Sequence, residues 1–234
     1  MRADIAALDL PDPMHPKPWE EKDEPLASDL HYDSQDYVRD ALRVILNPTL
    51  HYVTRDRWLH MDPAKPRDRL LPDLLVALDV PAARRDPDEF IPREVGKPPD
   101  LLGEFLSPSS EVADEEGKPK RYARLGVREY FLFDVVGVYD VPPVQGWRLR
   151  QDGSREPLPS DSEGGVMSEV LPVRFVFRDG WLQVQDTRTG DVVPRHQDFQ
   201  RRLEDIEVAR LQAEAENERL RAENERLRRE RDDQ

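Results

Sequence analysis

The chain has 234 residues and a formal net charge of −14, from 49 acidic and 35 basic side chains. It has no cysteine, which excludes disulfides, thiolate metal sites and cysteine nucleophiles. Because the net charge is negative, any contact with nucleic acid has to be local or assisted by a metal ion. No apolar run approaches about 18 residues, so we expect a cytoplasmic protein with no membrane-spanning segment and one main domain.

The N-terminal part divides into a polar lead-in and the start of a domain. Residues 1–30 are rich in proline and acidic residues and show no hydrophobic periodicity, so we expect them to be extended or disordered. The main domain is expected over residues 31–196. Within it, residues 33–47 carry apolar side chains at helical spacing and stop before Pro48, which predicts a helix.

Three segments have the continuous apolar pattern of strands that are buried on both faces. They are residues 71–80, 100–107 and 129–141. Residues 108–127 separate the last two strands and are helix-like in their second half. This order of helix, strands, helix and strand predicts an α/β sheet with a crossover connection.

Beyond residue 142 the pattern changes to short strands with turn signals. Residues 143–193 contain two Asp-Gly pairs, Asp152-Gly153 and Asp179-Gly180, between segments that alternate apolar and polar side chains. Asp-Gly at such a place is a strong hairpin signal. We therefore expect a β-rich extension of the same domain.

The C-terminal segment, residues 197–234, has a heptad pattern and contains the sequence AENERLR twice in succession. Its a positions are Leu203, Arg210, Asn217 and Asn224, and its d positions are Ile206, Ala213, Leu220 and Leu227. Asn at a with Leu at d favours a parallel two-stranded coiled coil, which predicts a homodimer formed through this helix. A solvated single helix and a coil with a different partner helix are the alternatives.

Two acidic residues and one lysine stand where the fold alone does not require them. Asp73 precedes the first apolar strand, Glu104 interrupts the second, and Lys118 follows. A buried carboxylate is costly unless a cation meets it, and Mg²⁺ or Mn²⁺ is commonly held by one or two carboxylates with water and phosphate. We therefore predict that Asp73 and Glu104 bind the metal and that Lys118 supports attack by water.

The sequence also resembles a known family. The motifs that carry this resemblance are PDLLVALD, PDLLGEFLSPSS, the series Asp114, Lys118 and Tyr122, and LGVREYFLFD at residues 125–134. They are similar to the Uma-type restriction endonucleases of the PD-(D/E)XK nuclease superfamily, over residues 35–190. The resemblance implies a restriction-endonuclease-like fold, with a mixed central sheet flanked by helices, and Mg²⁺-dependent hydrolysis of phosphodiester bonds.

The resemblance also implies roles for individual residues. Asp73 and Glu104 match the two metal-binding acids of the superfamily. Lys118 matches a catalytic lysine that has moved from the strand to the following helix, because the strand position for that lysine is Leu106 here.

Two points remain open in this match. Pro119 follows Lys118 directly, so either the helix begins near Pro119 or Lys120 takes the catalytic role. The additional acid that many members of the superfamily carry on the first helix has two candidates, Asp36 and Asp40.

Other polar residues near these motifs have simpler explanations. We expect loop or cap residues at Ser107, Ser109 and Ser110. Tyr122 and Tyr130 are expected to pack in the core, and Asp134 is expected to form a turn. The expected function is a divalent-metal-dependent endonuclease that acts on DNA. The alternative is a catalytically silent module of the same fold that binds DNA or assembles through the coiled coil, as the net charge, Leu106 and Pro119 would allow.

Overall fold

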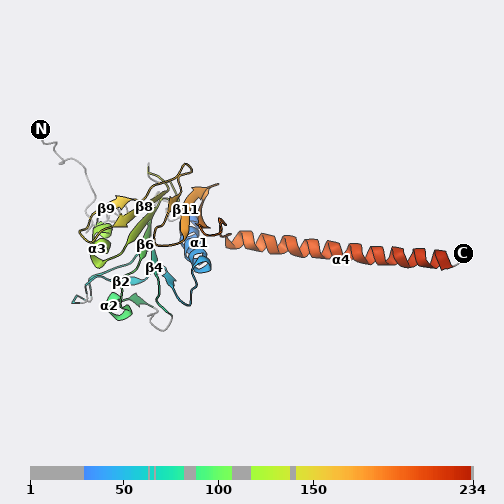
Figure 1. Cartoon of the computed structure of the whole chain (residues 1–234), viewed down its shortest axis with the longest axis horizontal. Helices are drawn as coiled ribbons and strands as arrows, with labels where there is room; N and C mark the ends of the chain where they lie inside the picture. Colours follow the sequence, from blue (N-terminus) through green and yellow to red (C-terminus); the bar gives the residue numbers. More distant parts are fainter. Residues whose placement is uncertain are drawn as a thin grey trace, which may run out of the picture.

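The structure is a computed structural model and describes residues 29–62, 64–65, 67–81, 88–106, 117–137 and 141–232. Its main domain is a mixed α/β fold with a six-stranded central sheet, two three-stranded sheets and short helices (Figure 1). A single long helix extends from this domain. The predicted fold class, a mixed central sheet flanked by helices, is confirmed.

The central sheet has the strand order β1-β4-β6-β7-β8-β9. These strands are β1 (Tyr52–Thr54), β4 (Leu74–Ala77), β6 (Leu101–Phe105), β7 (Glu129–Phe133), β8 (Val144–Leu149) and β9 (Arg155–Pro157). Within this sheet, as the described residues form it, β6 and β7 are parallel and the other neighbours are antiparallel. Parallel neighbours need a crossover connection, and helix α3 (Lys118–Leu125) lies in it, as the strand-helix-strand order predicted.

The central sheet separates two apolar cores, because successive side chains of a strand point to opposite faces. In β6, Leu101 and Phe105 belong to the core on the side of helix α1 (Asp29–Ile45), whereas Leu102 belongs to the core on the side of α3. Every residue of β6 is buried. This double burial explains why the strand is an almost continuous apolar run in the sequence.

The smaller sheets flank the central one. The first contains β2 (Trp58–His60), β3 (Arg69–Leu70) and β5 (Glu89–Phe90), with helix α2 (Pro92–Val95) after it; the second contains β10 (Val166–Met167), β11 (Val173–Arg178) and β12 (Trp181–Asp186). Asp179 and Gly180 join β11 to β12 with φ angles of 54° and 79°, so the hairpin predicted from Asp-Gly is confirmed.

The structure refines two expectations from the sequence. Helix α1 begins at Asp29, inside the segment 1–30 that the sequence analysis treated as extended. Of the β-rich segment, β8 and β9 continue the central sheet, and only β10 to β12 form a separate sheet. Strands β7, β8 and β9 pair in chain order, but the local pattern does not say which of two sheets a hairpin joins.

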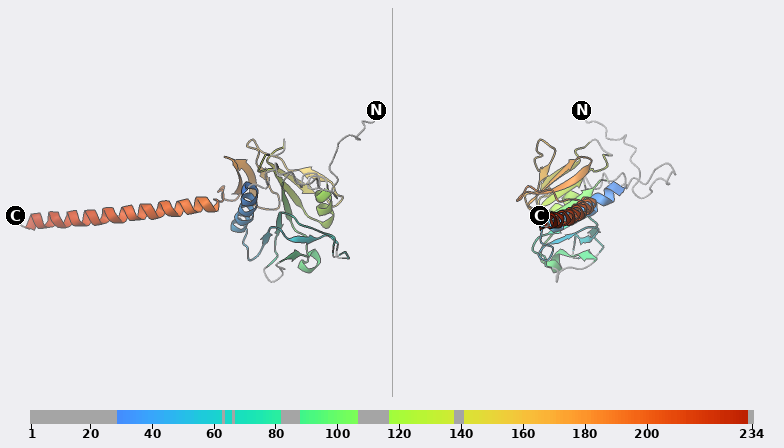
Figure 2. Two further views of the ribbon diagram at one scale, coloured as in Figure 1. Left: turned by 180° about the vertical axis from the view of Figure 1, so that it is seen from behind. Right: turned by 90° about the vertical axis from the view of Figure 1, so that its right-hand side faces the viewer.

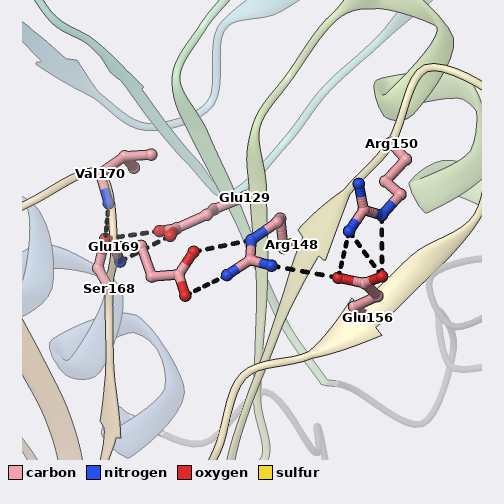
Figure 3. A network of polar contacts seen from close by, with 7 residues as sticks. All are labelled: Glu129, Arg148, Arg150, Glu156, Ser168, Glu169 and Val170. Carbon is pink, nitrogen blue, oxygen red and sulfur yellow. Dashed lines mark hydrogen bonds and ion pairs between the residues drawn. The ribbon is translucent and has the colours of Figure 1, made fainter.

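A network around Glu129 docks the segment before β11 against the central sheet (Figure 3). Glu129 is 1% exposed and accepts hydrogen bonds from the Ser168 hydroxyl (2.5 Å) and the Glu169 backbone N–H (2.7 Å). Burial raises the pKa of the Glu129 carboxyl, and these two hydrogen bonds oppose that rise. The Glu169 carboxylate pairs with Arg148, which also contacts Glu156. This buried acid therefore has a structural explanation.

Helix α4 (His196–Asp232) projects away from the domain in Figure 1 and in the left view of Figure 2, and the right view of Figure 2 looks along it. Its base is held by an aromatic cluster: the Tyr37 hydroxyl of α1 donates to the Val193 carbonyl (2.6 Å), and the Arg195 guanidinium lies 4.3 Å from the ring centroid of Trp181. Within the described ranges, no helix combines the length and apolarity needed to span a bilayer.

Candidate active site

Asp73 and Glu104 lie on one face of the central sheet. Strands β4 and β6 are antiparallel, with Leu74 opposite Gly103. The same register places Asp73, which immediately precedes β4, opposite Glu104. Residues directly opposite in an antiparallel pair project their side chains to the same face, and here it is the face that α3 covers. The two acids that the sequence singled out are therefore neighbours.

The Glu104 carboxylate is 1% exposed, and both of its oxygens accept hydrogen bonds from α3. Lys118 Nζ donates to Oε2 at 2.9 Å, and the Tyr122 hydroxyl donates to Oε1 at 2.8 Å. The lysine contact is also a salt bridge, which supplies the positive charge that a buried carboxylate needs. Lys118 and Tyr122 are four residues apart, so they lie on the same side of the helix.

The start of α3 explains how Lys118 reaches the strand. The helix begins at Lys118, after Gly117, and Pro119 occupies its first turn. A proline is tolerated there because backbone N–H groups of the first turn have no partner within the helix. Lys120 is exposed and has no ion pair within the described part of the chain. Of the two candidate lysines, the structure brings only Lys118 to Glu104.

Asp73 connects the two strands at this end of the sheet. Its Oδ2 accepts a hydrogen bond from the backbone N–H of Phe105 at 2.7 Å. Next to Glu104, Gly103 allows close packing on the opposite face, where an added Cβ would lie 3.2 Å from both Leu74 Cβ and Phe133 Cε2. The backbone around the acids is thus fixed by packing on one face and by the Asp73 contact.

The chemistry of these donors fits a hard divalent cation. Mg²⁺ and Mn²⁺ prefer oxygen ligands, and Mg²⁺ usually takes one or two carboxylates while water and phosphate fill its other positions. Among the described residues, no group of three or more His, Cys, Asp or Glu side chains could hold a metal ion. An ion held by Asp73 and Glu104 would therefore need water or phosphate oxygens to complete its coordination.

The structure does not bring the two first-helix acids to the pair. Asp36 forms salt bridges with Arg39 (2.7 Å) and Arg55 (3.0 Å), and Asp40 pairs with Arg39 (2.8 Å). Helix α1 packs against the core on the other face of the sheet from Glu104. Four other residues named from the sequence lie outside the described ranges: Ser107, Ser109, Ser110 and Asp114.

Sequence reasoning missed the contact made by Tyr122, which it assigned to the core. The ring is fully buried, but the hydroxyl reaches Glu104. The available signal was the spacing of four residues from Lys118. Tyr130 does pack in the core, with its ring centroid 5.8 Å from that of Trp147, and Asp134 accepts a hydrogen bond from the Gly137 N–H (2.9 Å) in a turn.

We predict that Lys118→Met lowers the free energy of unfolding by about 2–3 kcal/mol, because it removes the cation beside a buried carboxylate. The double variant Lys118→Met/Glu104→Gln should recover most of this loss, since the amide carries no charge. Lys120→Met is the matched control and should change stability by less than about 0.5 kcal/mol. Urea unfolding followed by circular dichroism measures all three; equal losses in the two lysine variants would contradict the assignment.

Comparison with known proteins shows the family to which the chain belongs. The family model "Uma2: Putative restriction endonuclease" matches residues 14–185. No curated protein sequence matches the chain. Among solved structures, a "putative nuclease belonging to DUF820" from Anabaena variabilis ATCC 29413 shares 17% identity, over 60% of this chain and 72% of that chain, with a TM-score of 0.43. This likeness is too weak to carry an argument. The family match spans more than half of the chain, and the protein belongs to the Uma2 family.

Proposed function

We propose that this protein is a divalent-metal-dependent endonuclease that hydrolyses phosphodiester bonds in DNA. One observation carries the proposal: Asp73 and Glu104 lie opposite each other on one face of the sheet, and Lys118 contacts Glu104. Membership of a restriction endonuclease family supports a nuclease function. The metal ion, the DNA substrate and the residue roles below are our proposal.

Asp73 and Glu104 would hold the ion, which, when bound, lowers the pKa of a coordinated water and stabilises negative charge on the phosphate. Lys118 is suited to a role at the reacting phosphate. Its side chain is 20% exposed, whereas that of Glu104 is 1% exposed, so Lys118 is the more accessible member of the pair. An ammonium group offers three N–H donors and a positive charge, which can orient water or neutralise a phosphate oxygen.

Helix α3 also supplies a local positive surface in an acidic protein. Its sequence, KPKRYARL, contains four basic residues and no acid, although the whole chain has a net charge of −14. Lys120 and Arg124 are exposed, lie on the same side of the helix and have no ion pair within the described ranges. These two cations lie about half a turn around α3 from Lys118 and Tyr122, on the exposed side of the helix, where they can contact a phosphate backbone.

Helix α4 favours a homodimer. The seam defined by the heptad carries exposed apolar side chains at Phe199, Leu203, Ile206 and Leu220. Glu216 at a g position and Arg221 at the following e position would pair between two parallel chains in register, and Glu223 and Arg228 repeat that spacing in the sequence. A parallel pair would place two catalytic domains at the same end, one for each DNA strand.

A catalytically silent module is the second candidate. It is favoured by one observation: Glu104 and Asp73 already accept hydrogen bonds from Lys118, Tyr122 and the Phe105 backbone, as they would in a purely structural polar cluster. A silent module would show neither metal binding that depends on these carboxylates nor nicking.

We predict that the wild type nicks supercoiled plasmid with Mg²⁺ or Mn²⁺ and is inactive when a chelator is added. Asp73→Asn and Glu104→Gln should each lower the nicking rate at least about 100-fold. Glu129→Gln is a matched control, because Glu129 is equally buried but lies on the opposite face of the sheet, and it should retain activity. Circular dichroism checks the fold. Calorimetric titration with Mn²⁺ separates the two candidate functions. If the heat of binding does not depend on Glu104 and the protein does not nick plasmid, the endonuclease proposal is wrong and the silent module stands.

A second prediction concerns the cations of α3. In the Glu104→Gln background, Lys120→Gln/Arg124→Gln should weaken binding to a DNA duplex and reduce the slope of log K against log salt by about 2, since each lost phosphate contact accounts for roughly 0.9. Arg43→Gln/Arg178→Gln removes two exposed arginines on α1 and β11 and should leave the slope unchanged. Equal slopes in both double variants would rule out α3 as the contact surface.

A third prediction concerns the heptad seam. Sedimentation equilibrium of the full chain should give the mass of a dimer, and Ile206→Asp/Leu220→Asp should give a monomer, because two d positions then carry charge. Val208 and Leu211 are equally apolar and exposed but lie off the seam, so Val208→Asp/Leu211→Asp should remain dimeric. A monomeric wild type would end the homodimer proposal.

A further inference from the structure

We propose that Tyr122 is a positioning residue for the metal site, because its hydroxyl fixes the orientation of the Glu104 carboxylate before an ion binds. This inference rests on the proposed function. It assigns to Tyr122 a role beyond the core packing expected from the sequence, and the role belongs to the hydroxyl rather than to the ring.

The geometry separates the two donors to Glu104. Tyr122 is fully buried and donates to Oε1 (2.8 Å), whereas the partly exposed Lys118 donates to Oε2 (2.9 Å). The terminal torsion of a glutamate side chain has a broad distribution, so the backbone alone does not define the direction of its oxygens. Two donors on one face of a helix hold both oxygens and remove that freedom.

Only one of these donors is suited to remain while an ion is bound. The Lys118 ammonium is positively charged and repels a second cation at the same carboxylate, and its long chain can move toward solvent. The Tyr122 phenol is neutral and rigid, and its ring packs 6.0 Å from the ring of Tyr130, measured between centroids. A carboxylate oxygen accepts more than one contact, so Oε1 can keep this hydrogen bond and still face a metal ion.

A purely structural role for the hydroxyl makes a different prediction. Buried tyrosine hydroxyls usually find a partner, and Glu104 would then simply satisfy Tyr122. In that case, removal of the hydroxyl would affect stability but not the affinity for metal. The affinity for metal is therefore the quantity that distinguishes positioning from packing.

The test uses the full chain and Mn²⁺ as the probe, with isothermal titration calorimetry for Kd and urea unfolding for stability. Tyr122→Phe keeps the ring, and we expect it to raise the Kd for Mn²⁺ about 10- to 100-fold, the usual effect of losing a partner of a metal ligand. Tyr37→Phe is the control: its hydroxyl also makes a hydrogen bond, a partly buried one to the Val193 carbonyl, but on the other face of the sheet. It should leave the Kd within about twofold.

Two further measurements exclude a general loss of structure. Replacement of Tyr122 by 4-aminophenylalanine keeps a hydrogen-bond donor at the same place and should restore the Kd for Mn²⁺ toward that of the wild type. In plasmid nicking, Tyr122→Phe should raise the Mg²⁺ concentration for half-maximal rate while leaving the rate at saturating Mg²⁺ close to that of the wild type, which is the signature of weakened binding.

The possible outcomes separate this inference from the proposed function. If the wild type binds Mn²⁺ through Glu104 and Tyr122→Phe binds it equally well, the inference is overturned and the proposed function stands. If the wild type binds no Mn²⁺, both are overturned. An unfolded Tyr122→Phe, with a folded 4-aminophenylalanine variant that still binds Mn²⁺ weakly, would also overturn the inference.

Discussion

The salt bridge between Glu104 and Lys118 is the interaction on which the arrangement of this domain depends. A carboxylate buried in the middle of a sheet is costly unless a positive charge or hydrogen-bond donors meet it. At Glu104 the parallel β6-β7 crossover supplies the charge, because it brings Lys118, the first residue of α3, to that place. Because an ammonium group of the same chain balances the charge, the fold does not depend on a divalent ion, unlike small zinc domains that unfold without metal. Under the proposed function, a chelator would stop the reaction without unfolding the protein.

Two buried glutamates on neighbouring strands show why burial alone does not define a functional site. Glu104 and Glu129 are both 1% exposed, but on opposite faces of the sheet. Glu129 accepts hydrogen bonds from neutral groups, the Ser168 hydroxyl and the Glu169 backbone, and it docks one segment onto another. Glu104 faces an ammonium group and lies opposite a second acid. The two glutamates differ in the charge of the groups that contact them, not in how deeply their carboxylates are buried.

The sequence predicted those features that depend on local pattern. The apolar runs of β4, β6 and β7 reveal a sheet covered on both faces, and the helix between the last two strands implies a crossover. The neighbourhood of Asp73 and Glu104 follows from adjacent strands. The sequence left open which sheet β8 and β9 join, because alternating strands suit either sheet. The choice between Lys118 and Lys120 and the second donor to Glu104 depend on the tertiary position of α3. A buried tyrosine has the same position in the sequence pattern whether or not its hydroxyl contacts a functional residue. The roles in metal binding stay predictions.

The cluster at the base of α4 has a consequence for how two domains would work together. Tyr37 and Arg195 tie the segment before the helix to α1 and to Trp181, so the helix leaves the domain without a flexible hinge at that point. In a pair joined by such helices, the two domains would keep a fixed mutual orientation. Under the proposed function, the stagger between the cuts in opposite strands would then be a constant number of base pairs, set by the protein fold rather than by the reach of a linker.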